Sequence, residues 1–492
     1  MSYNIVLFIL TNLKYLIMKK TFFIAATFAA LLISCEKAMD DSVVHNIMPQ
    51  IKVMKHGCIT TVNLNIVRQA AVSSNLVMNR NSRSKEEKEI KEIIPITDSL
   101  GRTMLYVVNY KYDKGYVIFS GNNEYHPVLA YNENGNFYIK KRADYSGAYL
   151  WLQEQKEAVK NVKSLPDSIR LRNKMAWNHI FDRTEYSQLS VKKKNSRAVD
   201  PDLEYQVGVY IEESLQKWSD EGYTIYSYGS GDLAEIPESE ADAIRTALEQ
   251  KAEDRFFGGF DGTVYIRVKN KVTKEKKGPL LKSTWNQVGT YGEYTPNGYA
   301  GCSAVAVGQI MRYHEYPTSY NWDAMAYNYP TDVTAQFLYE IGLKENMDYT
   351  GSQGSPASIN DACSAFRQYG YTSSKVVNHA SSTIMSQIRN FWPIYMRGTT
   401  SGEDKGHAWV CDGFDYTCYD YPYEVMAIDK STFDYTGKPY YRCIYSYNVM
   451  DYSTYFHMNW GWGGLDNGYF DDSTLKDKKY LTARKDIINI HP

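Results

Sequence analysis

Cysteine, histidine and asparagine residues in three separate segments of the C-terminal half have the types and the order that a thiol hydrolase needs. Cys302 begins an almost uncharged run, His407 lies in the apolar run 406–411, and Asn459 is followed by Trp460 in a glycine-rich turn. A thiolate can attack an acyl carbon, an imidazole can carry the proton, and an amide oxygen can orient the imidazole while an indole shields that bond from water. These residue types predict amide hydrolysis through a covalent thioester.

The element expected to carry Cys302 is a helix of roughly four turns. Gly301 permits a sharp backbone turn before it, and Tyr316 with Pro317 sets its end. Unpaired amides and the positive end of the helix dipole would then lower the pKa of the Cys302 thiol. The same apolar run also describes a core helix that holds an inert, buried cysteine. Taken alone, this segment leaves both interpretations open.

His407 is the histidine downstream of Cys302 that lies in a clearly strand-like apolar setting. A strand over residues 406–414 would present its imidazole rigidly, although a lone histidine in a strand is more often structural. His457 and His314 compete for the role of base. His314 lies on the expected helix of Cys302 itself, ~18 Å away along the axis, which is too far for proton transfer.

Together these segments resemble the streptopain family of papain-like cysteine peptidases, the C10 group, in its secreted and lipid-anchored bacterial forms. Four motifs carry the resemblance: Trp285-Asn286-Gln287, Gly301-Cys302 with Gln309 to Pro317, Gly406-His407-Ala408-Trp409-Val410, and Asn459-Trp460-Gly461-Trp462-Gly463-Gly464. The resemblance covers about residues 278–471. It implies an α+β fold, in which a helical part and an antiparallel β part form a papain-like peptidase domain behind an inhibitory prodomain.

The resemblance also implies roles for individual residues. Cys302 is the expected nucleophile, His407 the acid and base, Asn459 the group that orients His407, and Gln287 a donor to the oxyanion, with Trp460 in support. The loop that begins at Met347 resembles the border of the substrate cleft. The residues expected to contact substrate are Met347, Gly351, Ser352 and Gly406.

The first 35 residues have the pattern of an export signal. Lys19 and Lys20 precede the apolar run 22–33, and Leu32-Ile33-Ser34-Cys35 resembles the box of a bacterial lipoprotein signal. The pattern predicts lipidation of Cys35, a natural start at Met18, and attachment to the bacterial envelope at the outer membrane or cell surface. Release after maturation is left open.

The region between the signal and the peptidase motifs is expected to contain two parts. Residues 36–200 form a proregion with hairpins at 105–120 and 128–139, around Asn134-Gly135, and a helix at 148–162. Residues 106–139 are similar, less specifically, to the inhibitory proregion of the family. Residues 201–277 are an additional segment with helices at 207–218 and 238–257 and a strand at 263–268. Basic stretches at 192–197 and 269–277 are candidate cleavage joints. The second is favoured, which gives a peptidase domain of residues 278–492.

Composition excludes several other classes. The chain has 492 residues, 43% of them hydrophobic, and a formal net charge of −1, so nucleic acid is not an expected partner. Cysteines downstream of Cys35 fit no common zinc pattern and no disulfide scaffold, and no metal or cofactor is expected. The predicted partners are protein or peptide substrates, the chain's own prodomain, and a membrane through the lipid.

The function predicted from the sequence is a cysteine endopeptidase made as a zymogen and activated by removal of the proregion. The alternative is a catalytically silent, lipid-anchored binding protein on the same scaffold. A transglutaminase-like acyl transferase would normally use Asp as its third residue, so Asn459 disfavours it.

Overall fold

The computed structural model describes residues 62–78, 88–138, 147–166, isolated positions from 169 to 180, and residues 201–227, 264–269, 271–351, 355–399, 406–429, 440–472 and 484–492. All of these residues belong to one unit of the chain, residues 58–492. The signal sequence with Cys35, the basic stretch 192–197 and the helix expected at 238–257 lie outside the described residues. In the part that the structure describes, no helix combines the length and the apolar character needed to cross a membrane.

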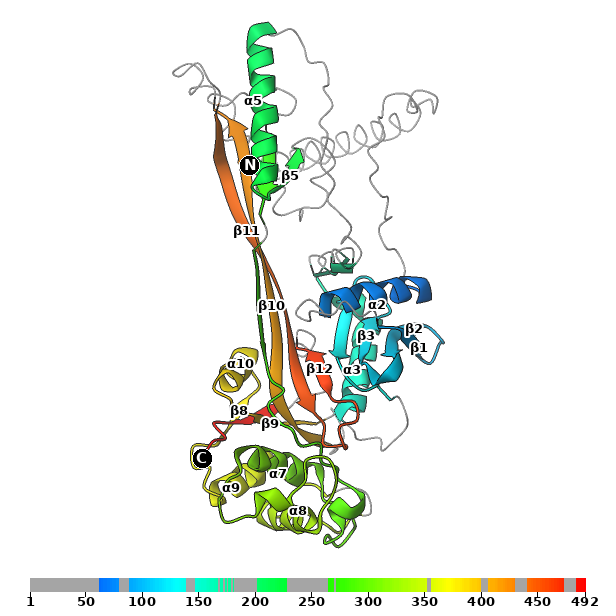
Figure 1. Cartoon of the computed structure of the whole chain (residues 1–492). Helices are drawn as coiled ribbons and strands as arrows, with labels where there is room; N and C mark the ends of the chain where they lie inside the picture. Colours follow the sequence, from blue (N-terminus) through cyan, green and yellow to red (C-terminus); the bar gives the residue numbers. More distant parts are fainter. Residues whose placement is uncertain are drawn as a thin grey trace, which may run out of the picture. The chain divides into compact units, whose positions relative to one another are not determined.

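Helices and antiparallel strands occur in separate groups along the described chain, which makes the fold α+β (Figure 1). The helices are α2 (Leu64–Met78), α3 (Gly147–Lys160), α5 (Pro201–Asp220), α7 (Cys302–His314), α8 (Asp332–Lys344), α9 (Ile359–Gln368) and α10 (Ser381–Arg389), with 3-10 turns η2 (Lys111–Asp113), η3 (Val162–Ser164), η5 (Gly289–Gly292) and η6 (Trp322–Ala324). The strands are β1 (Ile90–Thr97), β2 (Thr103–Tyr110), β3 (Tyr116–Ser120), β4 (Val128–Asn132), β5 (Thr224–Ser227), β6 (Val264–Val268), β7 (Lys271–Lys277), β8 (Lys375–Asn378), β9 (Ile394–Thr399), β10 (Gly406–Ile428), β11 (Tyr441–Asn459), β12 (Gly468–Asp471) and β13 (Lys485–Ile488).

One sheet connects the N-terminal part of the chain to the segments that carry the predicted site. Its strand order is β1-β2-β3-β4-β12-β11-β10-β9-β13-β8, so the meander β1 to β4 continues directly into β12. In that joint Tyr131 lies opposite Tyr469 and Ala130 opposite Phe470. We call residues 62–180 the N-terminal unit, because their own sheet and α3 share a core with β12.

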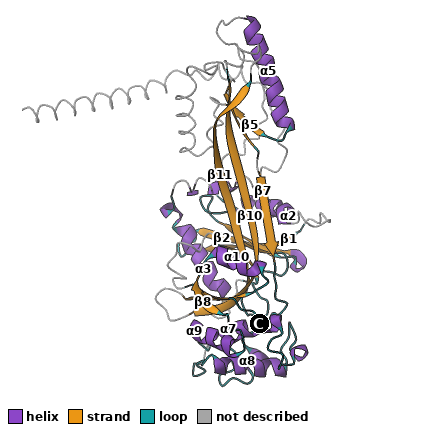
Figure 2. Ribbon diagram, turned by 90° about the vertical axis from the view of Figure 1, so that its left-hand side faces the viewer, coloured by secondary structure: helices purple, strands orange, loops and turns teal. Residues whose placement is uncertain are grey.

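Strand β10 is the strand on which the rest of the peptidase sheet is assembled. From Val410 to Ile428 it pairs with β11, and the two strands form a long hairpin (Figure 1). On its other side β10 pairs first with β9, then with β7 and finally with β6. Figure 2 shows β7 beside β10. His407 therefore lies at the beginning of this strand, next to β9.

Residues 201–277, which we call the middle segment, pack against the distal part of this hairpin. Strand β6 pairs with residues 423–427, and the side chain of Trp218 on α5 packs with Tyr265 and Met426. The basic stretch predicted as an open joint is exposed, as expected, but it is strand β7 and pairs with residues 414–420 of β10. Its alternating Lys, Val, Thr and Glu residues permit a strand whose side chains lie mainly in solvent.

The hairpin predicted at 105–120 is confirmed as β2 and β3, but the second predicted hairpin is wrong. Asn134-Gly135 does not join two paired strands, because β4 pairs with β3 and β12 instead. The backbone at Phe137 is held by the side chain of Asn109, which accepts from its N–H at 2.8 Å and donates to its C=O at 3.1 Å. Phe137 then packs on Tyr116 in the core, so the long-range contacts override the local turn.

Helix α7 begins at Cys302, as predicted. Gly301 before it has a φ of 88°, which favours glycine, and Glu315 after it adopts the left-handed conformation with a φ of 48°. The helix is buried over most of its length and packs against α8 and β10. An added Cβ at Gly308 would come within 2.9 Å of the Leu338 side chain, so the close approach of α7 and α8 requires this glycine.

Candidate active site

The Cys302 thiol lies at the N-terminus of α7 and faces strand β10. The backbone amide of Ala408, the residue after His407, hydrogen-bonds the thiol. Burial raises the pKa of the Cys302 thiol, while the Ala408 amide and the positive charge of Arg397 act in the opposite direction. The lowered pKa expected from the helix terminus is thus wrong for this state, because loss of water outweighs the helix and amide contributions.

His407 is buried and turned toward the glycine-rich turn after β11. Its Nε2 donates to the backbone carbonyl of Trp460 at 3.0 Å, which fixes the proton on that nitrogen. Burial lowers the pKa of His407 to about 4, so the imidazole is neutral here. The rings of Trp409 and Trp460 lie 6.0 and 6.4 Å from the imidazole. In this state His407 cannot stabilise a thiolate by charge.

The first residue of α3 covers this histidine from the N-terminal unit. A Cβ added to Gly147 would lie 2.2 Å from the Trp460 indole and 2.7 Å from Cδ2 of His407, so the backbone is in direct contact with both rings. One turn further along α3, Trp151 packs edge-on against Phe470 of β12, with ring centroids 4.8 Å apart. The N-terminal unit therefore closes the site on the side of His407.

Asn459 does not make the hydrogen bond to His407 that the sequence predicted. Its Nδ2 donates to the Ser283 carbonyl at 2.8 Å, and its Oδ1 accepts from Gln309 and from the Gly461 amide, both at 3.3 Å. Asn459 is the last residue of β11, and its side chain reaches back to α7. The carbonyl of the next residue takes the imidazole N–H instead.

Gln287, the predicted oxyanion donor, lies close to the start of α7, and its side-chain N–H group is unused. Its backbone carbonyl accepts from Ala300 at 2.9 Å, which fixes the residue close to the start of α7. Its Nε2 is buried and makes no hydrogen bond within the described structure. A buried donor without a partner costs free energy, which a developing negative charge on a bound carbonyl would recover.

Gln309 is a site residue to which the sequence analysis gave no role. It is fully buried on α7, seven residues after Cys302 and hence on the same helix face. Its Oε1 accepts from the Trp285 amide at 3.0 Å, and its Nε2 donates to Asn459. Gln309 thereby ties the segment of Gln287 and the turn after β11 to the nucleophile helix. A single amide in an otherwise apolar helical run was the signal available in the sequence.

The residues predicted to contact substrate gather only in part around Cys302. Met347 is buried, and its Cε would lie 2.3 Å from a Cβ at Gly301, so it supports the turn before the nucleophile. The Gly351 carbonyl accepts from Asn297 at 3.0 Å, which links this loop to the chain before α7. Gly406 begins β10 beside His407. Ser352 lies outside the described residues.

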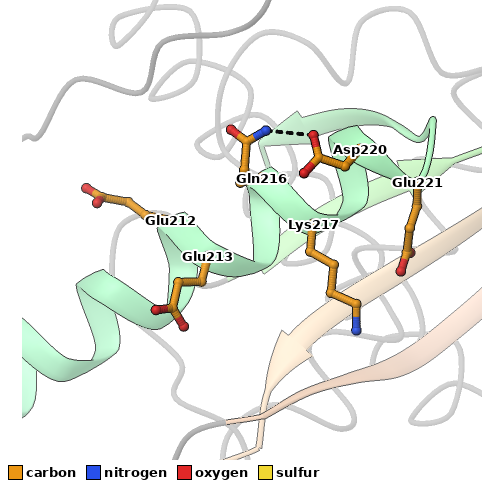
Figure 3. A pocket seen from close by; sticks show the side chains of 6 residues that line it. All are labelled: Glu212, Glu213, Gln216, Lys217, Asp220 and Glu221. Atoms are coloured by element: carbon orange, nitrogen blue, oxygen red, sulfur yellow. Dashed lines mark hydrogen bonds between the residues drawn. The ribbon is translucent and has the colours of Figure 1, made fainter.

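Two other candidate features, His457 and a surface hollow, lie apart from the residues around Cys302. His457 bonds through Nδ1 to the buried Asp412 at 2.6 Å, which places it in a structural pair. A surface hollow lies along α5, far along the chain from the predicted site residues, and its side chains are mostly acidic (Figure 3). It is lined by Glu212, Glu213, Gln216, Lys217, Asp220 and Glu221.

A thiol at a helix N-terminus, an imidazole on the adjoining antiparallel strand and an unused amide donor together define the arrangement of a papain-like cysteine peptidase. The site is closed by a preceding unit of the same chain.

Comparisons with known proteins agree with this arrangement. The model of the Peptidase C10 family matches residues 285–321 and 318–470, and the model of the Spi protease inhibitor matches residues 65–159. Streptopain of Streptococcus pyogenes is 23% identical, over 49% of this chain and 64% of that protein. The thiol protease/hemagglutinin PrtT of Porphyromonas gingivalis is also 23% identical, over 44% of this chain and 26% of that protein.

Among solved structures, a fragment of prointerpain A from Prevotella intermedia aligns with a TM-score of 0.44 and 16% identity, over 82% of this chain and 99% of that chain. The chain spans about 64% of the length of the streptopain sequences that it matches. On these two matches, residues 285–470 belong to the Peptidase C10 family, and residues 65–159 in front of them match a protease inhibitor.

Proposed function

We propose that the chain is a cysteine endopeptidase that is made as a zymogen and hydrolyses protein substrates after its N-terminal unit is removed. The contact of Gly147 with both His407 and Trp460 is the observation that carries this proposal. This contact explains why the imidazole is neutral and bonded to a backbone carbonyl although all the catalytic residue types are present. Removal of α3 would admit water and free the imidazole to face the thiol.

In the active form, His407 takes the proton of Cys302, and the resulting thiolate and imidazolium stabilise each other. The Cys302 sulfur attacks the peptide carbonyl, the C–N bond breaks, and the imidazolium gives its proton to the leaving amine. Water then attacks the thioester and gives a proton to the now neutral His407. The carboxylic acid product leaves, and the Cys302 thiol is restored. Asn459 is the proposed orienting group for His407 in this open state.

Gln287 and the backbone N–H of Cys302 hold the oxyanion of each tetrahedral intermediate. The Nε2 of Gln287 needs no other bond to be broken before it can do so, because it has no partner in the closed state. A donor of this kind contributes ~3 kcal/mol to transition-state stabilisation. Gln309 keeps this donor and the turn after β11 in fixed positions relative to Cys302.

The contacts of the middle segment favour a maturation cut before residue 201 over the joint at 269–277 that the sequence favoured. Strands β6 and β7 both belong to the ladder of β10, and Tyr210 on α5 accepts a hydrogen bond from the Tyr441 amide of β11. A cut within β7 would have to act on a paired strand, whereas peptidases bind extended, unpaired chain. N-terminal sequencing of the mature form distinguishes the two positions.

Export and lipid anchoring through Cys35 are further parts of the proposal. A diacylated cysteine supplies the two chains that stable membrane attachment needs. Cys35→Ser is therefore expected to move the protein from the membrane fraction to the soluble fraction, as measured by fractionation and immunoblotting. Unchanged fractionation would refute the anchor without affecting the proposed peptidase activity.

A thiol-directed epoxide probe tests the proposed activity. After proteolytic activation the probe should label Cys302, and labelling should prevent hydrolysis of a peptide library. Cys302→Ala protein, purified in the same way, is the control and should stay unlabelled at that position. An activated wild-type chain that neither takes up the probe at Cys302 nor cleaves peptides would instead support the silent binding protein.

A further inference from the structure

A fully buried carboxyl group lies behind the nucleophile. Glu345 ends α8, where its backbone N–H donates to the Ile341 carbonyl, and its side chain is entirely inaccessible to solvent. One oxygen, Oε1, accepts from the Ser303 hydroxyl at 2.9 Å. The other, Oε2, is buried and has no hydrogen-bond partner within the described structure. No step of the proposed hydrolysis uses this residue.

Ser303 connects this carboxyl to the nucleophile. It follows Cys302 in the first turn of α7 and is 2% exposed, with its hydroxyl turned into the protein. The same hydroxyl lies 2.8 Å from the phenol of Tyr395 on β9, which is also fully buried. Because Ser303 gives its single proton to Glu345, Tyr395 donates to Ser303. The first turn of α7 is thus held between α8 and β9.

The surroundings of Glu345 favour its uncharged form. Burial raises the pKa of Glu345 to about 8, the Ser303 bond opposes this, and the negative charge of Asp361 on α9 adds to it. The other ionisable groups of the described structure that interact with the charge of Glu345 all become negative when they ionise: Cys302, Tyr349, Tyr369 and Tyr395. An ionised carboxylate here would be both desolvated and repelled, so a neutral carboxyl is the form that this site accommodates.

The charge on Glu345 acts directly on the nucleophile. A negative Glu345 raises the pKa of the Cys302 thiol, whereas Arg397 on β9 lowers it. Formation of the Cys302 thiolate and ionisation of Glu345 therefore oppose each other, as expected for two like charges in one buried site.

We propose that Glu345 is a positioning residue for the proposed reaction. In its neutral form it fixes the first turn of α7 through Ser303, and when it ionises at alkaline pH it suppresses the Cys302 thiolate. The catalytic meaning of this role rests on the proposed function. The electrostatic coupling between Glu345 and the Cys302 thiol can be measured without any hydrolysis.

The experiment follows alkylation of Cys302 by iodoacetamide in the full-length chain with His407→Ala, so that no imidazole titrates beside the thiol and no processing occurs. Peptide mass spectrometry gives the rate at Cys302 between about pH 6 and pH 10. Adding Glu345→Gln, which keeps the acceptor for Ser303 but cannot ionise, should lower the pH midpoint of alkylation by about 0.5 or more and raise the rate near pH 8.5 about threefold. Glu340→Gln, which changes an exposed carboxyl on the same helix, should leave the curve unchanged.

Coincident curves with and without Glu345→Gln would overturn the proposal, and so would loss of Cys302 reactivity at every pH in a variant with an unchanged circular dichroism spectrum. If Glu345→Gln does not fold, Ser303→Ala serves instead. It removes the bond that favours the ionised form, so alkylation near pH 8.5 should become faster, and a slower rate would contradict the proposal. If Glu345→Gln shifts the alkylation curve but the activated wild-type chain hydrolyses no peptide, the proposed function is refuted and the role of Glu345 is not.

Discussion

The N-terminal unit and the middle segment both precede the peptidase motifs, yet they attach to the peptidase in different ways. The N-terminal unit joins the sheet through the short pairing of β4 with β12 and packs on the peptidase strands in a shared apolar core, with Tyr131 and Tyr469 stacked at 5.2 Å. The middle segment pairs along β10 through two strands and shares apolar cores with the β10 and β11 hairpin. Position before the motifs therefore does not by itself make a segment part of the removable prodomain.

The kinds of contact explain the difference. At the N-terminal unit the polar contacts are separate hydrogen bonds and ion pairs, such as Asn132 to the Asn467 carbonyl at 2.8 Å and Glu133 to Lys276 of β7 at 2.8 Å. In the middle segment Arg267 pairs with Glu424 at 2.8 Å and also lies over the Trp218 ring at 5.0 Å. These contacts accompany the backbone pairing of β6 with β10. Two strand pairings therefore hold the middle segment to β10, whereas a single pairing of two residues joins the N-terminal unit to β12.

The largest expected effect comes from Cys302→Ala. Without its nucleophile the chain should lose peptide hydrolysis by a factor of about 10⁴ or more and should keep both preceding segments, because no processing can start. Asn459→Ala should be milder, because it disturbs the orientation of an imidazole and removes no reacting atom. Hydrolysis assays and gel mobility over time measure both effects. Near-wild-type rates in Cys302→Ala would end the thiol-peptidase proposal.

Trp218→Ala tests the attachment of the middle segment. Trp218 is 5% exposed, and its removal should cost about 3–5 kcal/mol of unfolding free energy, seen in urea unfolding of the Cys302→Ala chain. Trp151→Ala in the N-terminal unit is the matched control. It removes a similarly buried indole, but it should increase thiol labelling of the uncut chain and leave the hairpin strands protected in hydrogen exchange. Equal loss of hairpin protection in both variants would contradict the distinction between the two segments.

Gly147→Ala tests the closure of the site by α3. The new Cβ would lie within 3 Å of the Trp460 and His407 rings, and such overpacking typically costs 1–3 kcal/mol. We expect the uncut chain to become about tenfold more reactive toward the epoxide probe, which corresponds to ~1.4 kcal/mol of weaker docking. Gly208→Ala on α5 adds a Cβ in open space and should not change the reactivity. Unchanged reactivity of Gly147→Ala would show that α3 does not close the site.

The smallest expected effect is a pH dependence of the docking of the N-terminal unit. Burial raises the pKa of Asp466 from 3.8 to about 6, and the Tyr138 amide of the N-terminal unit donates to its carboxyl at 2.8 Å. A group whose pKa is higher in the docked state takes up a proton on docking, so docking is strongest below about pH 4 and weakens as the pH rises through 6.

Processing of the wild-type chain by a small amount of added mature enzyme should accordingly be several-fold slower at pH 5 than at pH 7. Asp466→Asn should reduce this difference, with the mature enzyme's own pH profile measured separately on a peptide substrate. An Asp466→Asn chain with an undiminished pH difference would exclude this carboxyl as the cause.

Local features of the fold could be predicted from the sequence, and long-range ones could not. Gly301 and the residues around Pro317 define α7 through backbone conformation alone, so Cys302 was placed correctly at its start. The pairing of β4 with β12 joins residues more than 300 positions apart, and Asn134-Gly135 gives a local turn pattern that this pairing overrides. The prediction for the middle segment was limited in the same way, because its basic composition describes an exposed strand as well as an open joint.

In the site, too, the sequence predicted residue types but not the contacts between individual atoms. The types and order of Cys302, His407 and Asn459 indicated their chemistry, but the partner of His407 is a backbone carbonyl, which every residue possesses. The covering by Gly147 depends on a residue with no side chain at all. Gln309 had a visible signal as a polar residue in an apolar helix, yet its two partners are fixed only by the folded arrangement.

The short pairing of β4 with β12 also determines what the mature enzyme exposes. In the proposed mature form, which lacks the N-terminal unit, β12 would be the edge strand of the peptidase sheet, with unpaired backbone groups at Tyr469 and Phe470 that another extended chain could bind. The strand is only four residues long and ends at Asp471, with Asp472 directly after it. Short length and adjacent negative charge are features by which proteins limit pairing between sheets, so this strand can release its prodomain without becoming a template for aggregation.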